Sequence, residues 1–361
     1  MRREWIGSTA LATTLVSSVC VLSACGGGGG GSNIPGTNNP ATAQAAAACA
    51  VTQTGPFVAV SLTGQVGQAQ FSNGGAVLTY GSYPSSFSNN SLSGSLNLVK
   101  DPNNPGVCMD QGGATASMRT VLQSNGVIGI SHAMVNGADE PVVLLAQSAL
   151  AANTSLASLA GTYDLLRYQT DSTGGGQTRS SYVTFTVDST GGWSMCKNAP
   201  SCSTPTATGT FGALPGNASE FEFSSGGLVR GNSFIVNDGS TQILVTAEHD
   251  TGSGLVQGLH FGMAQAPWNP LSGPYATNTT DGVAAQTIVY GSAVGAAGKT
   301  PIALTTNSPV PGLATALAAD GTTVNYLIDT PSGLFVDASN TGNNFAGGPG
   351  FFAFGIIPPS N

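Results

Sequence analysis

Short apolar runs recur along the whole chain, each bounded by glycine, asparagine, aspartate or proline. The runs are rich in β-branched and aromatic residues and are roughly four to eight residues long, which is typical of β-strands. We predict strands at residues 57–62, 76–80, 92–99, 127–130, 182–187, 233–236, 242–247, 323–328 and 351–357.

Helical periodicity is scarce by comparison. Only residues 146–159 (AQSALAANTSLASL) and 313–319 have the apolar spacing of a short helix. We predict short linker helices there and an all-β fold elsewhere.

A Gly-x-aromatic triplet occurs three times, at Gly55-Pro56-Phe57, Gly161-Thr162-Tyr163 and Gly273-Pro274-Tyr275. Each triplet opens a block of roughly 100 residues, a period too long for a solenoid. Each block also ends in a strand, a tight turn and further strands, with Asn125-Gly126 and Asp238-Gly239 as favoured hairpin turns. We therefore expect antiparallel meanders in three weakly repeated blocks, 49–150, 151–268 and 269–361; chance similarity between β-rich segments is the alternative.

The Gly-x-aromatic opening resembles the start of lipocalin-like barrels. That resemblance implies small barrels or curved sheets. Whether the three blocks form separate domains or one merged body stays open.

Composition narrows the class of protein. Apolar residues make up 40% of the chain, but charged residues make up only 7%, against about 25% in soluble domains. Removing Arg2, Arg3 and Glu4 with a signal peptide leaves seven basic and sixteen acidic residues, a formal net charge of −9. Because nucleic-acid binding depends on clustered Lys and Arg, a nucleic-acid partner is excluded.

The N-terminus has the features of an export signal. Arg2 and Arg3 precede an uncharged run at 6–22, which is short for a membrane span. The run ends in Leu22-Ser23-Ala24-Cys25, which resembles the bacterial lipobox, and the whole start resembles that of β-proteobacterial lipoproteins. Ordinary secretion, with cleavage near Ala43-Gln44-Ala45, is the alternative.

The lipoprotein resemblance implies a signal peptide at 1–24 and lipidation of Cys25, so that the membrane is one partner. Gly26 after the cysteine implies the outer membrane, with the body facing the periplasm or the cell surface. Residues 25–48 are rich in Gly, Asn, Pro and Ala and predict a flexible tether.

Four cysteines remain in the mature part, and an even number in an exported protein predicts disulfides. Cys196 and Cys202 enclose a short turn-like loop, so we pair them with each other and Cys49 with Cys108. The spacing does not fit a zinc site, and no metal site is predicted.

Known catalytic, nucleotide-binding and calcium-binding motifs are absent from the sequence, so no catalytic residue or cofactor is predicted. Glu248-His249-Asp250, with His260 beyond it, is a cluster of ionisable residues. Side chains alternate along a strand, so Glu248 and Asp250 should share a face and His249 should point away. Solvated charges at a strand end are the favoured interpretation; a binding site containing Glu248 and His249 is the alternative.

Trp193 is the best candidate for a recognition aromatic, since tryptophan is enriched at binding hot spots. The alternative is that it packs against the predicted Cys196–Cys202 disulfide.

Two functions follow from these observations. The first is a lipid-anchored cell-envelope protein that acts as a non-enzymatic binding or structural β scaffold, with a glycan or an envelope protein as partner. The second is a membrane-tethered hydrolase of an extracellular polymer, which requires a Ser–His pair or convergent carboxylates. A cleft that gathers two or more of His132, Glu248, His249 and Asp250 would favour the hydrolase, and scattering of these residues would disfavour it.

Overall fold

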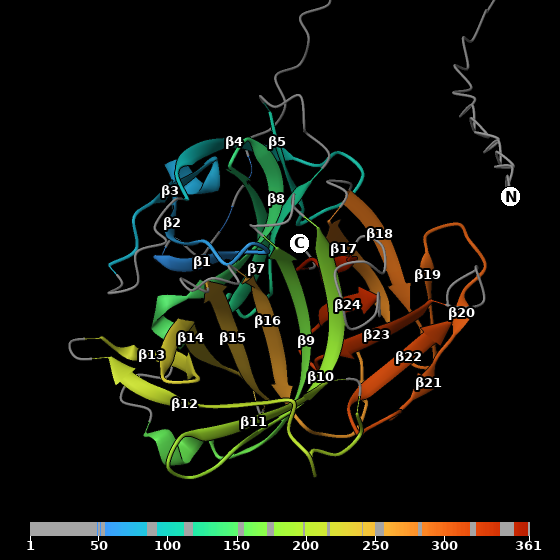
Figure 1. Cartoon of the computed structure of the whole chain (residues 1–361). Helices are drawn as coiled ribbons and strands as arrows, with labels where there is room; N and C mark the ends of the chain where they lie inside the picture. Colours follow the sequence, from blue (N-terminus) through green and yellow to red (C-terminus); the bar gives the residue numbers. More distant parts are fainter. Residues whose placement is uncertain are drawn as a thin grey trace, which may run out of the picture. The chain divides into compact units, whose positions relative to one another are not determined.

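The computed structural model describes most of the compact unit Ala46–Asn361 (Figure 1). The described residues are 49, 51, 55–84, 92–111, 118–150, 155–171, 177–197, 199–214, 217–239, 241–249, 256–280, 284–317, 323–339 and 350–359. The predicted signal peptide, the lipidation site Cys25, the tether and Asp250 lie outside these residues.

Eight antiparallel strands close into a first barrel, in which each strand pairs with the next along the chain. The strands are β1 (Phe57–Ser61), β2 (Val66–Ser72), β3 (Val77–Gly81), β4 (Gly94–Lys100), β5 (Cys108–Asp110), β6 (Arg119–Leu122), β7 (Ile128–Val135) and β8 (Ala138–Ala146). Pairing of β1 with β8 closes the barrel.

A second eight-stranded barrel has the same meander order. Its strands are β9 (Gly161–Asp171), β10 (Thr178–Val187), β11 (Gly192–Lys197), β12 (Ala207–Leu214), β13 (Asn217–Ser225), β14 (Leu228–Asp238), β15 (Thr241–His249) and β16 (Val256–Ala264). Pairing of β16 with β9 closes it.

The third sheet has nine strands and remains open between β20 and β21. Its strands are β17 (Gly273–Thr279), β18 (Ala284–Val289), β19 (Ala293–Ala296), β20 (Ile302–Ala303), β21 (Thr305–Thr306), β22 (Leu313–Leu317), β23 (Val324–Asp329), β24 (Leu334–Ser339) and β25 (Phe352–Ile356). Figure 1 shows the three sheets as successive stretches of the colour scale, from blue to green, from green to brown-orange, and from orange to red. The all-β fold with three repeated blocks is therefore confirmed.

A shared hydrophobic core joins the three sheets. On β1, Phe57 and Ala59 belong to a cluster made only of first-barrel residues, whereas Val58 and Val60 join a cluster that draws on all three sheets. Because successive side chains of a strand point to opposite faces, the first cluster fills the barrel and the second lies outside it. Phe261 of β16 meets Phe354 of β25 in this shared core, with ring centroids 5.8 Å apart. The blocks thus form one merged body.

The hairpin turns of the three blocks also meet. The Asp238 carboxylate, at the β14–β15 turn, accepts hydrogen bonds from Gln123 and Asn125 of the β6–β7 turn at 3.1 and 2.8 Å. It also accepts one from Ser332 of the β23–β24 turn, whose hydroxyl lies 2.8 Å from that of Thr330. We call these five residues the turn junction.

The opening triplets have equivalent structures in the second and third blocks. Gly161 and Gly273 have φ values of 159° and 158°. The Tyr163 hydroxyl donates to the carbonyl of Leu159, four residues earlier, and the Tyr275 hydroxyl does the same to Leu271, both at 3.0 Å. Phe57 of the first block has no hydroxyl to make this bond.

The structure differs from the two predicted helices. Residues 313–317 form strand β22, because the segment pairs with β21 and β23 and buries Leu313 and Ala314. The segment 146–159 holds two single-turn 3₁₀ helices, η2 (Gln147–Ala149) and η3 (Leu156–Leu159), with 151–154 outside the described residues.

Both predicted disulfides are present. Cys49 is bonded to Cys108 and Cys196 to Cys202, with Cα–Cα distances of 5.8 and 5.2 Å. The first ties the segment before β1 to β5, and the second closes the loop after β11.

Candidate functional site

The interior of the second barrel is divided into an apolar half and a polar half. The apolar half is packed with aromatic rings around Trp193, which stacks on Phe223 with centroids 4.7 Å apart and planes at 11°. The polar half lies at the other end of the same inner face. Its members are Arg167, Gln169, Arg179, Ser181, Lys197, Glu248 and His260.

Strand register places these side chains together. His260, Arg167 and Ser181 lie directly opposite one another on neighbouring strands, and Gln169 and Arg179 form the next row. Directly opposed residues of antiparallel strands point to the same face. Gly258 completes that row, where an added Cβ would lie 2.2 Å from the backbone oxygen of Tyr168.

Glu248 is the carboxylate of this cluster. Its Oε2 lies 2.9 Å from His260 Nε2 and accepts a hydrogen bond from Gln169, whose Oε1 accepts from Arg179 at 2.8 Å. Burial raises the pKa of Glu248, but the charge and hydrogen bond of His260, the charge of Arg167 and the Gln169 hydrogen bond outweigh it and lower the pKa to about 2. Glu248 is therefore ionised at neutral pH.

Three basic residues surround this one carboxylate. Arg167 is only 4% exposed and donates to Ser181 Oγ at 3.2 and 3.3 Å. Burial lowers its pKa to about 10. Burial, together with the charges of Arg167 and Arg179, lowers the pKa of Lys197 to about 8. Arg179 and Lys197 are only partly buried, so part of each of these two residues is exposed.

The structure separates the three candidate binding residues. Glu248 points into the barrel, so the expectation of a solvated strand-end charge is wrong for this residue. His249 follows it on the strand and lies on the opposite face, as alternation predicts. Trp193 is 4% exposed and belongs to the barrel core. It is therefore not a surface aromatic available for recognition.

Four residues of the polar half were not predicted as site residues from the sequence: Arg167, Gln169, Arg179 and Lys197. The signal was period-two alternation in 163–169, where Tyr163, Leu165, Arg167 and Gln169 fall on one face. Leu166 and Tyr168 on the other face are also buried, so the pattern did not say which face is inside the barrel.

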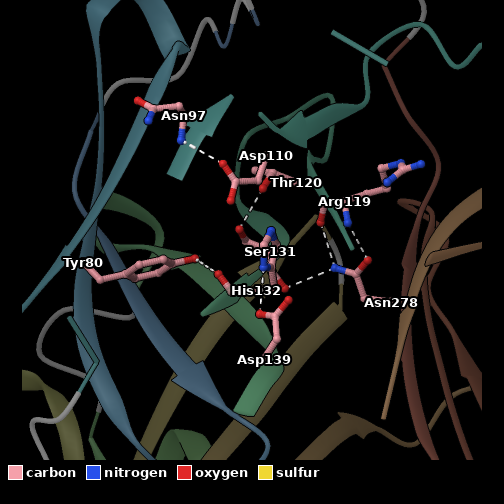
Figure 2. A network of polar contacts seen from close by, with 9 residues as sticks. All are labelled: Tyr80, Asn97, Asp110, Arg119, Thr120, Ser131, His132, Asp139 and Asn278. Carbon is pink, nitrogen blue, oxygen red and sulfur yellow. Dashed lines mark hydrogen bonds and ion pairs between the residues drawn. The ribbon is translucent and has the colours of Figure 1, made fainter. Parts of the chain in front are cut away.

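A second polar network lies where the first barrel meets the third sheet. Figure 2 shows His132 Nδ1 2.8 Å from Asp139 Oδ1, and the Tyr80 hydroxyl donating to the His132 carbonyl at 2.8 Å. The side chains of His132 and Asp139 are only 3% and 5% exposed. Burial raises the pKa of Tyr80, so this hydroxyl remains protonated and donates.

Asn278 of β17 connects this network to the third sheet (Figure 2). Its side-chain oxygen accepts from the Arg119 backbone N–H at 2.8 Å, and its amide donates to the carbonyls of Arg119 and Ser131 at 2.8 and 3.1 Å. Asn278 thus uses its side chain to bind two strands of the neighbouring barrel, which is a structural role.

Within the described residues, these two networks do not bring His132 and Glu248 into one cleft. His132 and Glu248 lie in different barrels, each with its own partner. Ser131 and His132 are adjacent on β7, so their side chains point to opposite faces, and Ser131 Oγ lies 2.8 Å from Thr120 Oγ1. Among the described residues, no group of three or more His, Cys, Asp or Glu could hold a metal ion.

The sequence matches no protein-family model, and no curated protein matches it. Within the described part of the chain, no helix has the length and apolar character needed to cross a membrane.

Proposed function

We propose that the protein is a lipid-anchored cell-envelope protein that acts as a non-enzymatic binding scaffold. We further propose that the polar end of the second barrel binds an acidic group of its ligand. The observation that carries this proposal is the charge distribution: three of the seven basic residues beyond the predicted signal peptide gather there around Glu248.

Clustering of cations in an acidic protein requires an explanation. Arg167, Arg179 and Lys197 repel one another, and this repulsion contributes to the lowered pKa of Lys197. Glu248 offsets one of the positive charges, and the charge of Asp171 also acts on Arg179. An incoming carboxylate, phosphate or sulfate would offset another and accept hydrogen bonds from the partly exposed Arg179 and Lys197. An acidic glycan or another envelope component has such groups.

The shared core suits a scaffold. It fixes the second barrel against the first barrel and the third sheet, so the charged cluster is held on a rigid body. The predicted lipid on Cys25, followed by the Gly-rich segment, would hold this body at the outer membrane.

Calorimetric titration of the full-length protein in non-ionic detergent tests the binding site. Glucuronate and inorganic phosphate should bind, and glucose should not. Arg179→Gln and Lys197→Gln should each weaken binding of both anions about tenfold, the effect of losing roughly 1.4 kcal/mol. Lys299→Gln, which removes the same charge at an exposed turn, should change little. Equal effects of all three substitutions would contradict the proposal.

Anchoring is tested separately by fractionation of cells grown with labelled fatty acid. The unaltered chain should be labelled and sediment with outer membranes, and Cys25→Ser should be unlabelled and soluble in the periplasm. Labelling that survives Cys25→Ser would show that the lipid is attached elsewhere.

A further inference from the structure

The third sheet lines an open cavity that is separate from the second-barrel site. It has a volume of about 260 Å³ and is lined by residues of β18, β19, β20, β22, β23 and β24. Small side chains make it hollow: Ala316 and Gly295 form part of the wall. At one side Leu327 and Phe335, both 1% exposed, supply an apolar surface.

The cavity has an apolar rim. Ile302 of edge strand β20 and Leu317 of β22 line it, and they are 43% and 54% exposed. The nine-stranded sheet does not close between β20 and β21, so this rim stands beside its open edge. Exposed large apolar side chains at the mouth of a cavity are typical of ligand entry sites.

Asp337 supplies the acidic group of the lining. Its Oδ2 accepts a hydrogen bond from Asn325 at 3.2 Å, and its Oδ1 is buried without a partner among the described residues. Burial raises the pKa of Asp337 to about 7, opposed only by the Asn325 hydrogen bond. Its carboxyl group therefore lacks both a second hydrogen-bond donor and a compensating charge.

We propose that this cavity binds a small apolar amine, whose ammonium group pairs with Asp337 and whose apolar body contacts Leu327 and Phe335. The formal net charge of −8 favours the approach of a cation over that of an anion. The cavity lies below the roughly 300–1,000 Å³ of drug-sized sites, so a single ring or a short alkyl chain is the fitting size. The proposal is independent of anion binding in the second barrel.

Calorimetric titration of the full-length protein in non-ionic detergent with benzylamine tests the proposal, with benzyl alcohol as its neutral counterpart. Benzylamine should bind at pH 8 at least tenfold more tightly than benzyl alcohol. Asp337→Asn should reduce benzylamine affinity at least tenfold and leave the alcohol unaffected. Glu222→Gln, which removes one acidic charge from the second barrel, should change neither.

Two further measurements keep the result interpretable. Benzylamine affinity should fall as the pH is lowered from 8 to 6, because Asp337 becomes protonated. Ala316→Leu fills the cavity and should abolish binding of both probes; near-ultraviolet circular dichroism shows whether each variant is folded. Absence of benzylamine binding, or binding unchanged in folded Asp337→Asn, would overturn the proposal.

Discussion

Glu248 and Trp193 lie on one inner surface of the second barrel, in halves of opposite character. Trp193 packs among rings, whereas Glu248 pairs with His260 and Gln169. The environment of each side chain depends on its position along the barrel axis. The strand register sets that position. A local pattern of residues does not contain that register.

The Glu248 carboxylate should stabilise the fold, because its removal leaves Arg167 and the neighbouring cations without their acidic partner. We expect Glu248→Gln to lower the free energy of unfolding at pH 7 by about 2–3 kcal/mol, below the range for fully buried pairs. Glu248 has a lowered pKa in the folded state, so this contribution is fully present above the unfolded value of 4.5. It is lost as the pH falls from 4.5 through about 2, and below about 2 the carboxylate is protonated in both states.

Urea denaturation of the unaltered protein and of Glu248→Gln between pH 3 and pH 8 measures the difference in their free energies of unfolding. Glu222→Gln is the matched control, because Glu222 lies on β13 between the inward Phe221 and Phe223 and so faces outward. A stability difference that is independent of pH would show that the charge of Glu248 is not its cause.

At the scale of strands and turns, the turn junction fixes how the blocks meet. Asp238 is 3% exposed and accepts hydrogen bonds from turns of the first and third blocks. Asn237 precedes it at the end of β14 and is exposed. Substitutions of Asp238 and Asn237 therefore compare a residue that joins the blocks with an exposed neighbour.

We expect Asp238→Ala to lower the free energy of unfolding by about 3 kcal/mol, since Gln123 and Ser332 would lose a buried acceptor. Asn237→Ala should change it by less than about 0.5 kcal/mol, as is usual for exposed positions. Urea denaturation measures both values. Similar losses for the two variants would mean that the turn itself, and not the junction, is responsible.

The sequence was sufficient for elements with a strong local signal. All nine predicted strands are present, although most boundaries differ by a few residues. A short helix was predicted at 313–319 from its apolar spacing, but pairing with β21 and β23 makes 313–317 a strand, and 318 and 319 lie outside the described residues. Strands such as β12 and β19 are rich in Gly, Ala and Thr and give no apolar run to detect.

The site was less predictable than the fold, because it depends on contacts between distant residues. Arg167 and Arg179 approach Glu248 across 81 and 69 positions of sequence through the β15–β16–β9–β10 register. The turn junction likewise required the packing of three blocks. The hairpin turns themselves could be predicted from the sequence, whereas their convergence could not.

At the scale of the whole molecule, the shared core decides whether three blocks behave as three domains or as one. Phe354 of the third sheet packs on Phe261 of the second barrel at 5.8 Å and on Phe352 at 5.1 Å. Phe211 lies in the hydrophobic cluster inside the second barrel, which contains only residues of the second block. If the shared core couples the blocks, truncation of either Phe354 or Phe211 should destabilise all three blocks.

We therefore expect one calorimetric transition, whose van't Hoff and calorimetric enthalpies agree. Phe354→Ala and Phe211→Ala should each shift that whole transition, with losses of about 3–5 kcal/mol from the cavity each leaves. If the blocks unfolded independently, Phe211→Ala would shift only the part of the enthalpy that belongs to the second barrel, and a second transition would remain in place. The shift of the complete enthalpy in both variants is therefore the signature of a merged body, since Phe211 is connected to the other sheets through contacts such as the shared core and the turn junction.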